Sequence, residues 1–321
     1  MTLIAWSWIF LVVYVGGMLV LGYMAGRKVQ DADAFATARG AYGPGFLAFA
    51  FAATTASGAT FLGGPGLTYQ HGLPAVWASL YPFGVYLGLL ICMRLVATAG
   101  NRFANRSIPE FLGDRYGSEG VRILVSVFSL LLFFYLAGQL VSGLVMFETM
   151  LGMSPLAALV FTTIVLLIYV TMGGAHADIL TDGVQGFIML LLALLVVVLF
   201  FLGAGVDGGF SGMIDRIREL DPNTVGVLNK TTPLFHSPWA VMTWTISLLP
   251  LGLLPHIGNK LWALKSDRDR SRFVKYAFLA SLAMAMMGLG GILARAVLGD
   301  ALFEEGTNPN QALPMLFIAL F

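Results

Sequence analysis

Hydroxyl-bearing residues interrupt a long apolar segment near the N-terminus, and they are the first candidates for chemistry in this chain. Residues 43–69 carry no charge, yet Thr54, Thr55 and Ser57 lie close together, and a Gly-Gly-Pro-Gly run follows at residues 63–66. In lipid every backbone N–H and C=O group needs a partner, so a loosened helical turn is tolerated only where it lines a protein-buried cavity. Many secondary transporters build mid-membrane sites for solute and cation from such discontinuous helices. The segment therefore predicts a binding site inside a membrane.

A second apolar segment, residues 238–262, is interrupted by prolines. Pro250 and Pro255 each lack a backbone donor, so they kink or break a helix. The two interrupted segments begin five spans apart and must cross the membrane in opposite directions, as an inverted five-plus-five repeat requires. The alternative is that Pro and Gly are simply common in membrane helices.

Apolar runs fill the rest of the chain. The 321 residues are 58% hydrophobic and 11% charged, against roughly 25% charged in a soluble domain, and the mean hydropathy is +0.84. Runs of about 20 apolar residues cross a bilayer as helices, so we predict an all-α integral membrane protein. The eight expected spans are residues 3–25, 43–69, 73–98, 121–150, 154–173, 178–203, 238–262 and 273–298.

No linker rich in Gly, Ser or Pro divides the chain, so residues 1–321 are expected to form a single transmembrane domain. Its expected parts are the first helix and an inner loop (1–42), the first inverted repeat (43–203), an outer loop (204–237) and the start of the second repeat (238–321). A short amphipathic helix is expected in the outer loop, around residues 213–220.

Basic residues indicate the orientation, because cytoplasmic loops carry an excess of Lys and Arg. With the N-terminus outside, the inner loops would hold 13 of the 18 basic residues: Arg27, Lys28, Arg39, Arg102, Arg106, Arg115, Arg122, Lys260, Lys265, Arg268, Arg270, Arg272 and Lys275. We therefore predict a multi-pass protein of the inner cell membrane with its N-terminus outside.

Several function classes lack support in the sequence. The single cysteine, Cys92, lies within a span and cannot build a thiol metal cluster. There is no nucleophile elbow, phosphate-binding loop, paired histidine–glutamate motif or dinucleotide fingerprint, so the chain is not expected to be an enzyme or to hold a cofactor. No basic patch indicates nucleic acid.

Several motifs resemble those of the sodium:solute symporter family. They are residues 169–185 (YVTMGGAHADILTDGVQ) with Met189, residues 61–66 (FLGGPG) with Tyr69 and Gly72, residues 108–112 (IPEFL) with Arg115-Tyr116-Gly117, and Pro255-His256 before a basic loop. The run at residues 63–66, together with Gln139 and Phe147-Glu148, is most similar to the sodium/pantothenate branch.

The resemblance implies a leucine-transporter-like fold with one extra helix in front of the ten core helices. Family members continue for several helices beyond the eighth. The sequence 1–321 is therefore expected to be truncated after its eighth helix and to lack the C-terminal part of the fold, which downstream helices or a second polypeptide would supply.

The same resemblance points to the backbone carbonyls of Ala53 and Ala56 as sodium ligands, with hydroxyl contacts from Thr55 and Ser57. A tightly packed small-residue interface is the alternative for this turn. Asp182 lies near the positive N-terminal end of its span and is the best ionisable candidate for a sodium ion on its way to the cytoplasm. Its alternative role is to cap the helix start together with Asp178 and Thr181.

Substrate contacts are expected from both interrupted segments and the fourth span: Thr54, Ser57, Thr60, Gln139, Trp244 and Ser247. Packing within the bundle is the alternative for each. A solute with a carboxylate, such as pantothenate, would suit the free N–H groups of a half-helix N-terminus. The predicted function is sodium-coupled symport of a small organic solute across the lipid bilayer into the cell, with sodium as coupling ion. The alternative is a membrane sensory input domain of a larger signalling protein.

Overall fold

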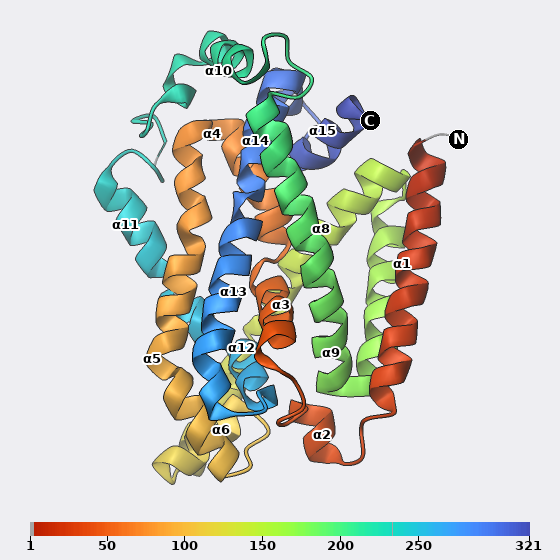
Figure 1. Ribbon diagram of the computed structural model, residues 1–321, viewed down its shortest axis with the longest axis vertical. Coiled ribbons are helices and arrows are strands. Elements are labelled where there is room, and N and C mark those ends of the chain that lie inside the picture. The colour runs from red at the N-terminus through yellow and green to blue at the C-terminus, as the bar shows by residue number, and fades with distance from the viewer. Residues whose placement is uncertain (1–2, 233) are drawn as a thin grey trace.

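The computed structural model describes residues 3–232 and 234–321, which form a bundle of helices (Figure 1). The α-helices are α1 (Leu3–Gly26), α2 (Ala32–Thr37), α3 (Pro44–Thr55), α4 (Gly64–His71), α5 (Tyr81–Arg102), α6 (Ile108–Tyr116), α7 (Glu119–Ser129), α8 (Leu132–Leu151), α9 (Pro155–Leu202), α10 (Gly209–Leu220), α11 (Pro238–Ser247), α12 (Pro255–Lys260), α13 (Arg270–Ala285), α14 (Leu289–Leu298) and α15 (Ala312–Leu320). A π-helical turn, η1 (Ala59–Gly63), and the 3-10 turns η2 (Leu73–Leu80), η3 (Pro222–Val225), η4 (Leu249–Leu253), η5 (Leu261–Ala263), η6 (Asp267–Asp269), η7 (Met286–Gly288), η8 (Ala301–Phe303) and η9 (Pro309–Gln311) complete the helical elements.

The number of membrane spans agrees with the sequence. In the described residues, five helical stretches are long and apolar enough to cross a membrane, and two bent pairs raise the number to seven. One of the five, α9, turns back at Gly174, and its two legs run in opposite directions (Figure 1). Gly174 has φ 51° and ψ −135°, a conformation open to glycine and strained for other residues. Counting both legs gives eight spans, so the prediction of an all-α membrane protein with about eight helices is confirmed.

Both interrupted segments are bent helices. The first pair, Pro44–Thr55 and Ala59–His71, bends by 63°, and the second, Pro238–Gly252 and Pro255–Ala263, by 59°. The second bend follows from proline chemistry, because Leu254 precedes Pro255 and is held in an extended conformation (ψ 142°). The predicted breaks are therefore real features of the fold.

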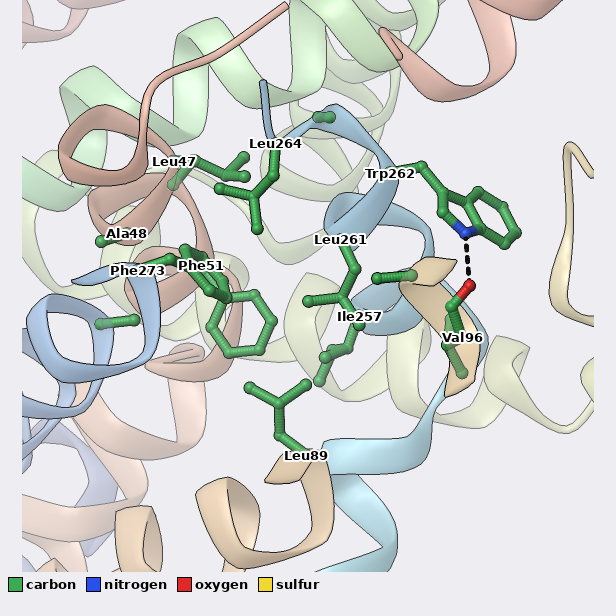
Figure 2. Close-up of a cluster of buried hydrophobic side chains, with 14 of the residues drawn as sticks. Leu47, Ala48, Phe51, Leu89, Val96, Ile257, Leu261, Trp262, Leu264 and Phe273 are labelled. Atoms are coloured by element: carbon green, nitrogen blue, oxygen red, sulfur yellow. Dashed lines mark hydrogen bonds between the residues drawn. The ribbon is translucent and has the colours of Figure 1, made fainter. Parts of the chain in front are cut away.

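The buried core joins the two bent pairs to α5 and α13. Helix α3 packs between α9 and α13, and Phe51 meets Phe273 edge to face with ring centroids 5.2 Å apart. Figure 2 shows Leu261 and Trp262 of η5 reaching toward α5, where the Trp262 indole N–H donates to the Val96 carbonyl at 3.0 Å. This core fixes the position of α12 relative to α3.

Glycines allow the second bent pair to lie directly against α5. A Cβ atom on Gly84 would collide with the carbonyl of Thr245, and one on Gly88 with the carbonyl of Leu249. A Cβ atom on Gly252 would in turn collide with the backbone of Val85. Small residues that let backbones approach closely are typical of helix packing in membranes.

The predicted short amphipathic helix is α10, which begins a little earlier than expected. It covers one end of the bundle in Figure 1, and α2 and α6 lie at the opposite end; these are called the α10 end and the α2 end below. Met213 and Ile217 of α10 are buried against the bundle, whereas Arg216 and Arg218 are exposed.

Candidate functional site

Two cavities meet at the loosened turn between α3 and η1. The smaller, of about 370 Å³, is lined among others by hydroxyl and aromatic residues: Thr55, Thr60, Tyr81 and Trp244. The larger, of about 980 Å³, is lined among others by Ala53, Thr54, Gln139 and Asp182. Ser57, Tyr135 and His256 line both cavities. The break therefore lies where a solute and an ion could meet.

The turn leaves backbone carbonyls without their regular helical partners. Helix α3 ends at Thr55, and the N–H group of Ala56 bonds back to Ala52 at 2.8 Å. The carbonyls of a helix's last turn have no partner further along the helix. The carbonyls of Ala53 and Ala56, the two predicted cation ligands, thus both lie at the broken end.

The hydroxyl groups of the turn point to different neighbours. Thr54 donates to the Asp182 carboxylate or to the Ala50 carbonyl, at 2.7 and 2.9 Å. Thr55 lies 3.2 Å from the hydroxyl of Ser281 on α13. Thr60 is buried beside the smaller cavity. The structure therefore groups Thr54 with the carboxylate and Thr55 and Thr60 with the smaller cavity.

Gln139 of α8 holds the turn in place. Its side-chain carbonyl accepts a hydrogen bond of 2.8 Å from the N–H group of Gly58. The turn lies directly against α8 here, since a Cβ atom on Gly58 would collide with Ser142. Gln139 also lines the larger cavity, but its amide oxygen is already bonded to the Gly58 N–H group.

The second bent pair contributes Trp244 and His256. The indole N–H of Trp244 and the Nε2 atom of His256 are buried without a hydrogen-bond partner in the described residues. The His256 ring stacks on Tyr135, with centroids 5.5 Å apart. Ser247 is exposed and its hydroxyl bonds to the Trp244 carbonyl at 2.7 Å, so the structure does not bring it to either cavity.

Asp182 takes part in an ion-pair cluster around a buried lysine. The ammonium group of Lys260 lies 2.5 Å from Asp182, 2.9 Å from Asp178 and 2.6 Å from the Thr54 hydroxyl. The Lys260 side chain is only 5% exposed. This cluster ties α12 of the second bent pair to α3 of the first and to the second leg of α9.

The placement of Lys260 in a basic inner loop was wrong. The helix resumes after Pro255, so Lys260 belongs to α12 inside the second bent pair, where two carboxylates compensate its buried charge. The ion pairs of Lys260 could not be predicted from the sequence, because its partners Asp178 and Asp182 are remote from it along the chain. Tyr81 and Tyr135 were also missed, since aromatic residues in apolar spans rarely stand out.

A third cavity, of about 340 Å³, lies on the α2 side of the ion pair. It is lined by Phe35, Ala36 and Thr37 of the α2 segment and also by Asp178, His256 and Lys260. Asp178 and His256 line the larger cavity as well. The cluster therefore stands between the large cavity and the α2 end.

Hydrogen bonds between separate segments hold the α2 end together. Arg39 donates to Asp33, to Asn101 and to the Asn105 carbonyl, at distances of 2.6 to 3.0 Å. The hydrogen bonds and charge of Arg39, with help from Arg106, hold the pKa of Asp33 below its usual value. Backbone hydrogen bonds join Tyr42 to Ala263 at the end of η5, at 2.9 Å, and to Lys265 just after it, at 3.1 Å.

Helices broken at matching places, with cavities and a buried ion pair at the breaks, define a class of membrane transport proteins. Residues 35–321 match the sodium:solute symporter family, and the chain belongs to that family. Among the described residues, no three His, Cys, Asp or Glu side chains are grouped to hold a metal ion. The chain is a multi-pass membrane protein of a transporter family, as the sequence predicted.

Relatives of this chain include proline and pantothenate transporters. The chain is 30% identical over 86% of its length to the high-affinity proline transporter PutP of Bacillus subtilis, and 28% over 96% to the sodium/proline symporter of Salmonella typhimurium. It is 29% identical over 85% of its length to the sodium/pantothenate symporter of Haemophilus influenzae. The chain matches 55 to 61% of the length of these relatives.

A solved structure confirms the fold. A Na+-coupled sialic acid symporter in a substrate-bound, outward-open state superimposes with a TM-score of 0.72 over 97% of this chain and 66% of the symporter. The identity is 20%, so the likeness concerns the fold, and the predicted leucine-transporter-like class is confirmed.

Proposed function

We propose that this protein carries a small organic solute into the cell by sodium-coupled symport. The observation that carries the proposal is the meeting of both bent pairs at Thr54, Asp182 and Lys260, beside two cavities, in a chain of the sodium:solute symporter family. Residues 43–203 and 238–321 then belong to two inverted repeats, and sodium is the coupling ion.

The proposed sodium position is the broken end of α3. The carbonyls of Ala53 and Ala56 would supply hard oxygen ligands, and Thr55 and Ser57 would add hydroxyl groups. Asp182 would receive the ion next, because it lines the larger cavity while its neighbour Asp178 lines the cavity toward the α2 end.

The proposed solute position is the smaller cavity. The unpartnered indole N–H of Trp244 favours a solute that offers a hydrogen-bond acceptor, since a buried polar group gains most from a partner. Ser57 and Thr60 add hydroxyl groups at the same cavity. A monocarboxylate provides such acceptors, and proline, pantothenate and sialic acid, the solutes in the relatives' names, are all carboxylic acids.

The proposed orientation places the α2 end in the cytoplasm of a cell whose inner membrane the protein spans. That end carries Arg27, Lys28, Arg39, Arg102 and Arg106, in line with the positive-inside rule. Sodium and solute would bind from the α10 end, and their higher affinity for one conformation would shift the equilibrium toward release at the α2 end.

The test is uptake into proteoliposomes under an inward sodium gradient. The panel contains monocarboxylates, pantothenate, proline, other amino acids and sugars, with potassium replacing sodium as control. A tenfold sodium gradient is worth about 1.4 kcal/mol, so one coupled ion supports about tenfold accumulation of a neutral solute. Equal uptake in sodium and potassium, or accumulation driven by a proton gradient alone, would contradict the proposal.

A further inference from the structure

The ion-pair cluster at the breaks has an unusual composition for a cation site, because it already contains a cation. The Lys260 ammonium has three N–H donors, and three oxygen acceptors surround it, from Thr54, Asp178 and Asp182. A hydroxyl and two carboxylates are also the kind of oxygen ligands that a hard metal cation takes. Lys260 and a free cation would therefore compete for the same atoms.

The charges of the cluster do not cancel. Two carboxylates against one buried ammonium leave one net negative charge at the wall of the larger cavity, which both Asp178 and Asp182 line. The partners of Asp182 in the described part of the chain, Lys260 and Thr54, both contact Oδ2, which leaves Oδ1 for another ligand. Asp182 also lines the larger cavity, so a monovalent cation can reach it from there.

We infer that Lys260 is a tethered cation that occupies one cation position of the cluster and limits it to a single free monovalent cation, held at Asp182. The inference rests on the proposed sodium-coupled function. Lys260 is anchored on α12, and Asp182 on α9, so the tethered charge also joins the second bent pair to the wall of the large cavity. Without this charge the same oxygens would accept a second free cation.

Charge-changing variants separate this role from a merely structural one. Lys260→Met leaves the cluster with two negative charges, whereas Lys260→Met combined with Asp178→Asn returns it to one. Lys260→Arg keeps the charge, and Lys265→Met removes an exposed lysine elsewhere as a matched control. Each purified variant is titrated with sodium chloride, with choline chloride keeping the ionic strength constant, and protection against thermal unfolding is followed.

The slope coefficient of stabilisation against RT ln[Na+] at saturating sodium, which equals the number of bound ions, should rise by about one in Lys260→Met. The double variant, Lys260→Arg and Lys265→Met should keep the wild-type value. An unchanged coefficient in folded Lys260→Met would overturn the inference. If Lys260→Met does not fold, the double variant serves as the test. A coefficient in the double variant that differs from the wild-type value would then overturn the inference. Absence of any sodium response in the wild type would refute the proposed function itself, and this inference with it.

Discussion

Ser57 is the residue where the two halves of the proposed site meet. It lines both cavities, and its carbonyl accepts hydrogen bonds from Thr60 and Phe61 at the start of η1, at 2.8 and 3.3 Å. These bonds fix the Ser57 backbone at the junction of the cavities. A change at this position should affect ion and solute together.

We predict that Ala53→Leu and Ser57→Val each weaken the sodium stimulation of uptake about tenfold. The leucine side chain would fill the ion's volume, and valine would remove a hydroxyl oxygen at a cost of about 1 to 3 kcal/mol for the group left unpaired. Uptake measured against sodium concentration gives the result, with Ala137→Leu on an exposed part of α8 as control. Unchanged sodium dependence in both variants would refute this ion position.

We predict that Trp244→Phe raises the KM for solute about tenfold or more without changing the sodium dependence. The substitution keeps an aromatic ring against Phe235 and removes only the unpartnered N–H group. Losing one hydrogen bond to a charged solute costs about 1.5 to 3 kcal/mol. Trp239→Phe, at a tryptophan that is 68% exposed on the same helix, is the control. Equal KM values in all three proteins would exclude Trp244 as a solute donor.

At the residue scale, the sequence predicted the composition of the site better than its connections. The hydroxyl groups near residue 55 and the carboxylate of Asp182 stand out because they are polar in apolar segments. The partnership of Asp182 with Lys260 could not be read, because it depends on how α12 packs against α9, 78 positions earlier in the chain. Ser247 was expected near the solute because its segment is bent, but it projects from the exposed face of α11.

At the scale of elements, the breaks depend on close backbone packing as much as on proline. Helix α5 approaches α11 at Gly84 and η4 at Gly88 and Gly252, where any side chain would collide with a facing carbonyl. Lipid offers no hydrophobic force between helices, so such contacts carry much of the packing.

We predict that Gly88→Ala lowers the free energy of unfolding by about 1 to 3 kcal/mol, the usual cost of overpacking. The new methyl group would push η4 away from α5 and disturb the second bend. Thermal unfolding in detergent measures the effect. Gly17→Ala, at an exposed position of α1 with no atom near the new Cβ, should be neutral or slightly stabilising. Equal loss of stability in both variants would show that packing against η4 is unimportant.

We predict that Arg39→Gln loosens the α2 end, and that its effect is smaller at low pH. Because Arg39 holds the pKa of Asp33 below its usual value, the pair stabilises the folded protein above about pH 4, and that contribution is lost as the pH falls through the lowered pKa. The Tm of wild type should exceed that of the variant at pH 7, and the difference should shrink below about pH 4. The exposed Arg272→Gln is the control, and a pH-independent difference would contradict the argument.

Element boundaries could be predicted well because hydropathy and turn chemistry mark them directly. The turn at Gly174 falls in the short gap between two predicted spans, and the amphipathic pattern predicted a helix at residues 213–220, which the structure extends back to Gly209. The bend angles of 63° and 59° could not be predicted, because they depend on how each bent pair packs against helices that are remote in sequence.

At the scale of the whole molecule, we expect the two bent pairs to move as one body. Their α2-side ends are joined by the backbone hydrogen bonds of Tyr42, by the Trp262 core and by Arg39 stacked over the Trp262 ring at 5.8 Å. Helix α1 lies outside this body and packs on α9 instead. A rocking motion would therefore move the bent pairs with α5 and α13 relative to α1 and the first leg of α9.

This division predicts which distances change when sodium and solute bind. In a Cys92→Ser background, spin labels at positions 102 and 265 both report on the joined body, whereas labels at positions 28 and 265 report across its boundary. The first distance should stay constant and the second should change, because differential affinity for two arrangements shifts their populations. The distances are measured by pulsed electron paramagnetic resonance in four conditions: without ligand, with sodium alone, with solute alone, and with both. If the distance between positions 102 and 265 changed as much as the other, the bent pairs would not move with α5, and coupling would have to arise from rearrangement within the bent helices themselves.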